Sequence, residues 1–372
     1  MIYRSFGSTG KKVSAIGFGG MRFADQNDAE ACAALITAAY QKGINYFDTA
    51  PGYGKSEELF GAAFKEMKKQ RKQKPFYVAT KTVKSSPSEI REEIERSLRR
   101  MDLDAIDFYH VWCVLSMDGL RERIKNGALK EFERLKNEGL IRHICISTHM
   151  QGKEISQAFE EYPFEGILLG YSAMNFAYRD EGLTAAAKHD CGVVVMNPLG
   201  GGIIPQYSQR FSFVKTTSDE SAVEGALRFL INDPRIAISL VGFSNQAQLE
   251  EAIRAVDGYQ PIPTETIAHI RESMNEAFNS LCTGCGYCDS CPEEIPVPKL
   301  MEAYNHFMLS EDPQAMLNRL RWHWGIQLDS ETLRKCTRCG TCEAACTQKL
   351  PITDRLQKMR ELADTFLAKN KS

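Results

Sequence analysis

Short runs of apolar and β-branched residues alternate with longer amphipathic stretches from Val13 to Asp257. We interpret eight of these runs as strands, at residues 13–20, 45–50, 76–81, 106–112, 143–149, 166–172, 192–198 and 238–243. The stretches between them place apolar residues at helical spacing, as in residues 28–43, which end at a glycine. Eight strand–helix units with mostly apolar strands predict an α/β fold, a closed (β/α)8 barrel of parallel strands.

The alternation stops after Tyr259, where the sequence QPIPTE follows. The rest of the chain holds a helical stretch at 264–281, two cysteine-rich runs and a helical segment between them. We therefore expect a barrel domain over residues 1–262 and a mainly helical domain over 263–372. With few apolar strands of its own, this tail depends for its folding on its cysteines and on what they bind.

Length and charge limit the classes of function. A chain of 372 residues has room for a large barrel of about 250 residues and a second, smaller domain. With a net charge of −2, the chain lacks the excess of positive charge that attracts nucleic acid or an anionic membrane. The segment RLRWHWGIQ at 319–327 combines arginine with aromatic residues, but we favour a surface that packs the tail against the barrel over a nucleic-acid site.

The N-terminal sequence lacks the basic start and apolar core of a signal peptide. No apolar run approaches the roughly 20 residues that span a bilayer. We therefore expect no membrane association and a cytoplasmic location, where thiols stay reduced.

Eight of the twelve cysteines lie in two matched runs, CTGCGYCDSCP at 282–292 and CTRCGTCEAAC at 336–346. Because cytoplasmic thiols stay reduced, clustered cysteines indicate metal ligands. The spacing Cys-x2-Cys-x2-Cys suits iron–sulfur clusters, since one short loop supplies three ligands and leaves the fourth to a distant cysteine. Paired structural zinc sites are the alternative, but zinc motifs usually separate their cysteine pairs by about a dozen residues or more.

The two runs resemble a bacterial-type two-cluster ferredoxin. This resemblance implies two [4Fe–4S] clusters, the first on Cys282, Cys285, Cys288 and Cys346, and the second on Cys336, Cys339, Cys342 and Cys291. Two departures stand against the crossed assignment: the first run has two residues before its last cysteine, and Thr347 replaces the expected proline. The isolated cysteines, by default, are buried packing residues: Cys32, Cys113, Cys145 and Cys191.

Three polar residues fall at the ends of two expected strands. Asp48 ends the second strand, Tyr53 lies on the loop beyond it, and Lys81 ends the third. A phenol with the ordinary pKa near 10 is a poor acid at neutral pH, whereas a neighbouring ammonium held by a carboxylate lowers a phenol pKa. This combination suits proton transfer to a carbonyl oxygen during reduction.

The segments DTAPGYGKSE, ATK, ISTH and PLGGG resemble the aldo-keto reductases over roughly residues 1–258. The resemblance implies catalytic roles for Asp48, Tyr53 and Lys81, and a histidine at the end of the fourth strand. That position falls on Trp112, and His110 lies two residues earlier. Both side chains face the same way because strand side chains repeat every two residues. His110 is therefore either a catalytic residue working from one layer deeper or a core histidine.

The resemblance also implies NADPH or NADH, bound without a Rossmann glycine-rich loop. The implied contacts are Ser147 with the carboxamide, Tyr171 stacked on the nicotinamide, Leu199 and Gly200 of PLGGG at the pyrophosphate, and Ser244, Gln248 and Glu251 at the adenosine end. Gln248 stands where NADPH-using members often have arginine, and a glutamine cannot neutralise a 2′-phosphate. Leu168 replaces a glutamine that usually binds the nicotinamide, so the preference between the two cofactors stays open.

Together these features predict an NAD(P)-dependent oxidoreductase of the aldo-keto reductase type, acting on a small carbonyl or alcohol, with two clusters for electron transfer. Nicotinamide moves two electrons as hydride and each cluster moves one, so a link between them needs an intermediate carrier, a flavin or a substrate radical. A redox partner protein is a separate candidate partner. Two alternatives remain. The clusters are structural or redox-sensing in a carbonyl reductase, or the barrel is a regulatory module that binds nucleotide without turnover.

Overall fold

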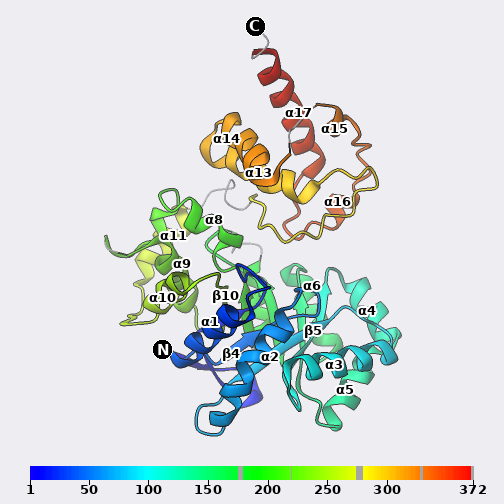
Figure 1. Cartoon of the computed structure of the whole chain (residues 1–372), viewed down its shortest axis with the longest axis vertical. Coiled ribbons are helices and arrows are strands. Elements are labelled where there is room, and N and C mark those ends of the chain that lie inside the picture. The colour runs from blue at the N-terminus through cyan, green and yellow to red at the C-terminus, as the bar shows by residue number, and fades with distance from the viewer. Residues whose placement is uncertain (175–178, 219, 274–279, 327–329, 370–372) are drawn as a thin grey trace. The chain divides into compact units, whose positions relative to one another are not determined.

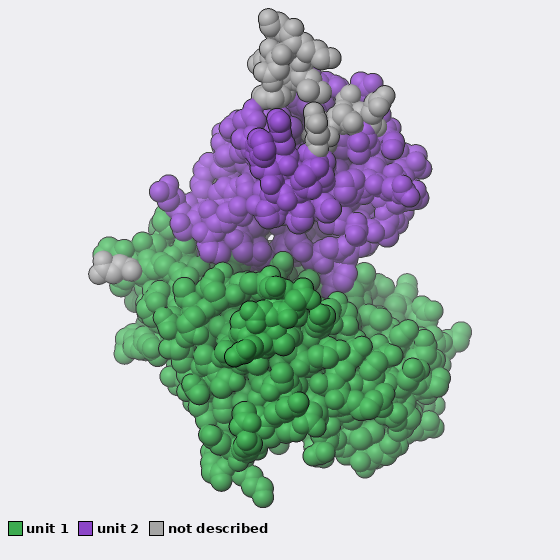
Figure 2. Space-filling view, in the orientation of Figure 1, with its two compact units in different colours: residues 1–199, 212–271 green, residues 200–211, 272–372 purple. Residues whose placement is uncertain are grey.

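A computed structural model describes residues 1–174, 179–218, 220–273, 280–326 and 330–369. The chain divides into two compact units (Figure 2). The first comprises residues 1–199 and 212–271, and the second comprises residues 200–211 and 272–372. Each unit is described below by itself.

The first unit is a closed barrel of eight parallel strands in the order β10-β3-β4-β5-β6-β7-β8-β9. Its strands are β3 (Ile16–Gly19), β4 (Tyr46–Asp48), β5 (Tyr77–Thr82), β6 (Ile106–Val114), β7 (Ile141–Thr148), β8 (Gly166–Gly170), β9 (Gly192–Met196) and β10 (Ile238–Gly242). Each lies within or overlaps one of the eight expected runs. The predicted α/β barrel is therefore confirmed.

Helices surround the strands of this unit (Figure 1). They are α1 (Ala29–Gln41), α2 (Ser56–Met67), α3 (Pro87–Met101), α4 (Met117–Lys125), α5 (Ala128–Asn137), α6 (Gly152–Glu161), α7 (Asp180–Lys188), α9 (Ala222–Ile231), α10 (Gln246–Arg254) and α11 (Thr264–Ser273). Polar side chains fix several of their starts. Asp28 accepts a hydrogen bond from the Ala31 amide at the start of α1, and Ser221 and Glu224 form a capping box on α9.

An antiparallel hairpin of β1 (Tyr3–Ser5) and β2 (Lys12–Ser14) precedes the barrel, and the sequence pattern did not predict it. Between these strands Phe6 is fully buried, with its ring centroid 4.3 Å from that of Phe108 and 6.1 Å from that of Tyr46. Tyr46 begins β4, so Phe6 fills the N-terminal end of the barrel interior. The opposite end, where the strands finish, is left for a functional site.

The second unit is mainly helical, as expected. It contains α8 (Ile203–Gln206), α13 (Val297–Ser310), α14 (Pro313–Asn318), a π-helical turn at Arg319–His323, α15 (Ser330–Arg334), α16 (Thr341–Ala344) and α17 (Ile352–Lys369). Its buried core includes four of the clustered cysteines, Cys282, Cys288, Cys342 and Cys346, together with apolar side chains of α13 and α17. Over the described parts of the whole chain, every helix is too short or too polar to cross a membrane.

Candidate functional site

A buried ion pair lies at the C-terminal ends of β4 and β5. The Lys81 Nζ atom donates to Asp48 Oδ1 and to the Thr49 carbonyl oxygen, each at 2.7 Å. The Lys81 and Asp48 side chains are 0% and 2% exposed. Burial lowers the pKa of Lys81 and raises the pKa of Asp48, and the pairing between them opposes both shifts. The ammonium is thus held in place by two acceptors inside the barrel.

Tyr53 lies beside this ammonium on the loop between β4 and α2. Lys81 Nζ is 5.0 Å from the centroid of the Tyr53 ring. The loop is fixed by hydrogen bonds from the Tyr53 amide to the Ala50 carbonyl and from Gln26 Nε2 to the Tyr53 carbonyl, each at 3.0 Å. The structure therefore brings together the three residues that the sequence placed on two separate strand ends.

Trp112 packs against the other side of Tyr53. The two ring centroids are 5.6 Å apart and the planes meet at 88°, an edge-to-face contact. A side chain on Gly52 would force the indole to shift, because a Cβ atom there would lie 2.9 Å from Trp112 Cη2. The pairing of β6 with β7 shifts register between Val111 and Val114, and Cys113 has a positive φ of 57°. The indole thus sits on a bulged strand end.

His110 lies one layer deeper than Trp112 on β6. It is opposite Lys81 in the pairing of β5 with β6 and is fully buried. Its Nδ1 atom is 3.4 Å from the Thr80 carbonyl oxygen, and its Nε2 atom has no hydrogen-bond partner among the described residues. Burial, and then the positive charge of Lys81, lower the pKa of His110 to about 3. The imidazole is therefore neutral at neutral pH.

The residues expected at the adenosine end lie where β10 leads into α10. The Ser244 amide donates to Gln248 Oε1 at 2.8 Å, and Ser244 Oγ donates to the carbonyl oxygen of Arg22 at 2.7 Å. The first side-chain carbons of Arg22 lie directly over Gly242, since a Cβ atom on that glycine would be 2.8 Å from them. Arg22 is exposed and forms no ion pair with any described residue.

Arg22 was missed by sequence reasoning. The signal was present in the segment GFGGMRF at the end of the first barrel strand, which closes the barrel next to the last strand. Of the other expected cofactor residues, Ser147 is buried near the end of β7 and Glu251 is half-buried on α10. Leu199 and Gly200 follow β9 directly in the chain.

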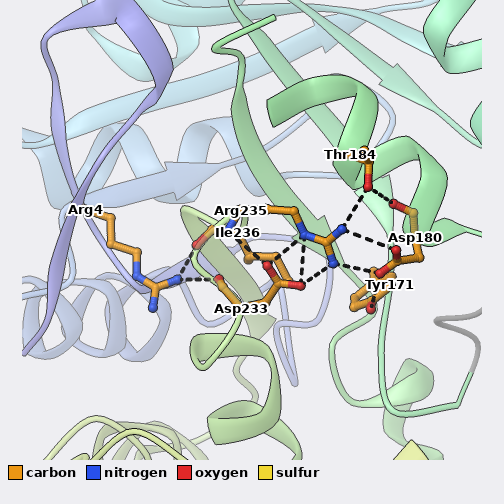
Figure 3. A network of polar contacts seen from close by, with 7 residues as sticks. All are labelled: Arg4, Tyr171, Asp180, Thr184, Asp233, Arg235 and Ile236. Atoms are coloured by element: carbon orange, nitrogen blue, oxygen red, sulfur yellow. Dashed lines mark hydrogen bonds and ion pairs between the residues drawn. The ribbon is translucent and has the colours of Figure 1, made fainter. Parts of the chain in front are cut away.

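Tyr171 belongs to a different set of contacts (Figure 3). Its side chain is buried, and its hydroxyl donates to Asp180 Oδ1 on α7 at 3.5 Å. Arg235 joins Asp180 to Asp233, donating to them at 2.7 and 2.6 Å, and also donates to Thr184. The hydroxyl is thus tied to Asp180 at the start of α7. Stacking of Tyr171 on a nicotinamide stays a prediction.

The first group of cysteines draws on both runs. Burial raises the pKa of Cys282 and of Cys288 to about 12, and thiolate charge on Cys285 and Cys346 adds to both shifts. Backbone amides donate to two of the sulfur atoms, Gly284 to Cys282 and Leu350 to Cys346, each at 3.4 Å. These donors suit thiolates that bear charge when they bind a cluster.

The second group also draws on both runs. A single cavity is lined by Cys291 of the first run and by Cys336, Cys339 and Cys342 of the second. Cys339 is exposed, whereas Cys342 is buried. Within the described ranges, no three acidic, histidine or cysteine side chains converge closely enough to hold one metal ion. Four thiols suit a cubane cluster, because a cubane distributes its ligands over four iron corners.

The model of the aldo/keto reductase family matches residues 15–275 of the chain. The chain belongs to the aldo/keto reductase family. A second model, of a 4Fe-4S dicluster domain, matches residues 281–351. Both resemblances inferred from the sequence are therefore confirmed, and the protein is an oxidoreductase of the aldo-keto reductase type with an iron–sulfur domain.

Relatives of this aldo/keto reductase are distant in sequence. L-galactose dehydrogenase from Arabidopsis thaliana is 26% identical, over 74% of this chain and 95% of the relative. A probable voltage-gated potassium channel subunit beta from the same plant is 22% identical, over 69% of this chain and 92% of the relative. Among solved structures, an aldo-keto reductase from Bacillus halodurans in its holo form has a TM-score of 0.63 and 24% identity, covering 74% of this chain and 97% of that one. That likeness shows the barrel fold.

Proposed function

We propose that this protein transfers a hydride between a nicotinamide dinucleotide and a small carbonyl or alcohol substrate, and that its two [4Fe–4S] clusters carry single electrons. The observation that carries the proposal is the buried Lys81–Asp48 pair, whose ammonium lies 5.0 Å from the Tyr53 ring. Burying an ion pair has a desolvation cost that its mutual attraction only partly offsets, and titratable groups perturbed by burial and by a specific partner gather at catalytic sites.

In this proposal the bound dinucleotide supplies the hydride, which goes to the carbonyl carbon of the substrate. Tyr53 gives its phenolic proton to the carbonyl oxygen, so the product is an alcohol and Tyr53 is left as a phenolate. Lys81 stabilises that phenolate, and Asp48 holds Lys81 in place through the 2.7 Å ion pair. Solvent returns the proton to Tyr53. Alcohol oxidation is the reverse of these steps.

Trp112 stands beside Tyr53 at the position where the family usually has a histidine. At its position the indole offers an apolar edge to Tyr53 in place of an imidazole that could hydrogen-bond the substrate oxygen. We assign His110 a positioning role, because it is neutral, buried and opposite Lys81. The substrate oxygen would then be polarised by Tyr53 alone, with an apolar group of the substrate against Trp112.

For the cofactor, we propose NADPH over NADH. Gln248 cannot neutralise a 2′-phosphate, but the backbone of Arg22 lies beside Ser244, and the exposed Arg22 side chain has no carboxylate partner among the described residues. Guanidinium groups bind phosphate oxygens in a bidentate manner. Arg22 therefore supplies the charge that the usual position lacks.

For the clusters, we propose that Cys282, Cys285, Cys288 and Cys346 ligate the first and Cys291, Cys336, Cys339 and Cys342 the second. Two observations support this division. Cys285 and Cys346 add to the raised pKa of both Cys282 and Cys288, and the other four cysteines line one cavity. Each cluster carries one electron, so exchange with the two-electron nicotinamide needs a flavin, a substrate radical or a redox partner protein.

The decisive experiment measures NADPH and NADH oxidation against a panel of aldehydes and ketones, under anaerobic conditions with the clusters intact. Turnover that the panel stimulates supports the proposal. Tight nucleotide binding with no turnover on any carbonyl, and no reduction of NADP⁺ by any alcohol, would favour a regulatory barrel. That alternative is supported by Trp112 and by the name of the potassium channel subunit among the relatives. Turnover that is unaffected when the clusters are oxidised or reduced would favour structural clusters.

A further inference from the structure

The segment Gly200–Phe211 belongs to an unexpected part of the molecule. It follows β9 directly in the chain, and it begins with the glycines of the PLGGG sequence expected at the cofactor pyrophosphate. Nevertheless it clusters with residues 272–372, the unit that contains both cysteine runs. Two contacts within this unit account for the grouping.

The first contact joins Gly201 to the loop of the first cysteine run. Gly201 has a positive φ of 70°, and a Cβ atom there would lie 2.2 Å from the carbonyl oxygen of Thr283. Only glycine allows both the backbone conformation and this close approach. Thr283 is buried and lies between Cys282 and Cys285, so the glycine packs directly on the loop that presents two proposed cluster ligands.

The second contact joins Tyr207 to α13. The Tyr207 hydroxyl and His306 Nδ1 form a hydrogen bond, and the two rings meet at 63° with centroids 5.3 Å apart. Glu302 Oε1 lies 3.7 Å from His306 Nε2, which favours the tautomer with its proton on Nε2. In that tautomer, His306 Nδ1 accepts a hydrogen bond from the Tyr207 hydroxyl. Burial raises the pKa of Tyr207 to about 12, so the hydroxyl keeps that proton.

The same helix also holds the first cysteine. Asn305, next to His306, is buried; its Oδ1 atom accepts from the Cys282 amide at 2.8 Å, and its Nδ2 atom donates to the Cys282 carbonyl oxygen at 2.7 Å. Glu302 is fixed in turn, since it accepts hydrogen bonds from Arg319 at 2.6 Å and Trp324 at 2.8 Å. One turn of α13 thus connects Cys282 to Tyr207.

We propose that the loop of the first cluster and helix α13 hold the segment Gly200–Phe211 in one conformation, so that loading of the first cluster controls the order of this segment and its affinity for the pyrophosphate of a nicotinamide dinucleotide. Tyr207 and His306 are positioning residues in this coupling. The part that concerns the nucleotide rests on the proposed function, whereas the coupling between cluster and segment does not. A cluster fixes Cys282 and Cys285; without it Thr283 and the Asn305 contacts loosen, and the segment loses its support.

Hydrogen exchange of residues 203–211, followed by mass spectrometry on the full-length protein under anaerobic conditions, tests the coupling without using activity. We expect faster exchange in this segment for Tyr207→Phe, with iron and sulfide content unchanged. Tyr259→Phe is the matched control, because the Tyr259 hydroxyl makes a similar hydrogen bond, to Asn232 at 2.8 Å, in the other unit. Loss of one such bond should also weaken NADPH binding by roughly two- to tenfold in Tyr207→Phe and not in Tyr259→Phe.

A second comparison separates the two clusters. Cys282→Ser should accelerate exchange in residues 203–211 and weaken NADPH binding, whereas Cys339→Ser, which affects the other group, should do neither. If Cys282→Ser does not fold, Tyr207→Phe decides alone. Unchanged exchange of the segment in Tyr207→Phe would overturn the inference. Wild-type protein that binds no nucleotide, but whose segment still responds to Tyr207→Phe, would overturn the proposed function and leave the coupling intact.

Discussion

The Tyr53 hydroxyl carries the proton on which the proposed chemistry depends. Tyr53→Phe keeps the ring, its edge contact with Trp112 and the cation beside it, and removes the transferable proton. We expect the rate of hydride transfer in a single turnover to fall by roughly 10²- to 10⁴-fold. Cofactor affinity, measured on the same sample, should stay the same. An unchanged rate would mean that the barrel uses another acid or no acid.

His110→Ala is the companion variant. Because His110 is fully buried and neutral, its loss should lower the free energy of unfolding by about 1–3 kcal/mol and slow hydride transfer far less than Tyr53→Phe does. A loss of rate equal to that of Tyr53→Phe would instead show that the imidazole takes part in the chemistry from its deeper layer.

Arg22 decides the proposed preference for NADPH. Arg22→Ala should raise the Kd for NADPH by about 10- to 100-fold, since a hydrogen bond to a charged phosphate is lost, and should leave the Kd for NADH nearly unchanged. Titration calorimetry with both cofactors measures this difference. Arg142→Ala, which removes an exposed arginine near the start of β7, is the control for net charge. Equal losses for both cofactors would remove Arg22 from the 2′-phosphate site.

Among the elements, the barrel strands were predictable, because each lies within or overlaps a longer run of mostly apolar residues, whereas the hairpin strands were not. Runs such as residues 192–198 are apolar because both faces of a parallel barrel strand are covered, and all eight were recognised. The strands of the β1–β2 hairpin have only three residues each, too few to show a period of two. The bulge after Val111 depends on the pairing with β7, which no local pattern reveals.

The same distinction holds for the site. Asp48, Tyr53 and Lys81 could be found because each stands at a strand end in a recognisable order, and parallel strands end at the same rim. The place of Arg22 beside Ser244 comes from a contact between segments 222 residues apart, and the hydrogen bond from Tyr171 to Asp180 depends on how the chain after β8 turns into α7. Such contacts depend on how the segments pack, so the segment GFGGMRF shows that Arg22 follows the first barrel strand but not which residues lie beside it.

In the proposed ligation the two cysteine runs act together, because each cluster takes ligands from both runs. Cys282→Ser and Cys346→Ser should therefore remove the same cluster, and electron paramagnetic resonance of the reduced variants should show the same remaining signal. Cys336→Ser provides the contrast, since it should remove the other signal. Different signals remaining in the first two variants would mean that each run serves its own cluster.

For the whole molecule, two cubane clusters fix the metal content. Anaerobically purified protein should be brown and contain roughly eight iron and eight acid-labile sulfide per chain. Removing the iron with a chelator should unfold the second unit, whose buried core includes four of the cysteines, while the barrel keeps its strands. Far-ultraviolet circular dichroism and limited proteolysis would follow the unfolding of the helical unit after chelation. Stoichiometric zinc without sulfide would contradict the assignment of two iron–sulfur clusters.

The difference in exposure between the two cysteine groups has a practical consequence. Cys339 is open to solvent, whereas three of the four cysteines of the first group, Cys282, Cys288 and Cys346, are buried. In the proposed ligation, dissolved oxygen should therefore reach the second cluster before the first. A preparation that has been exposed to air should then be a mixture of molecules with one cluster or two. Its colour and total iron content would decrease as the second cluster is lost. Rates from such samples should be normalised to the spectroscopic signal of the first cluster, since that buried group is the one linked to Gly201 and Tyr207.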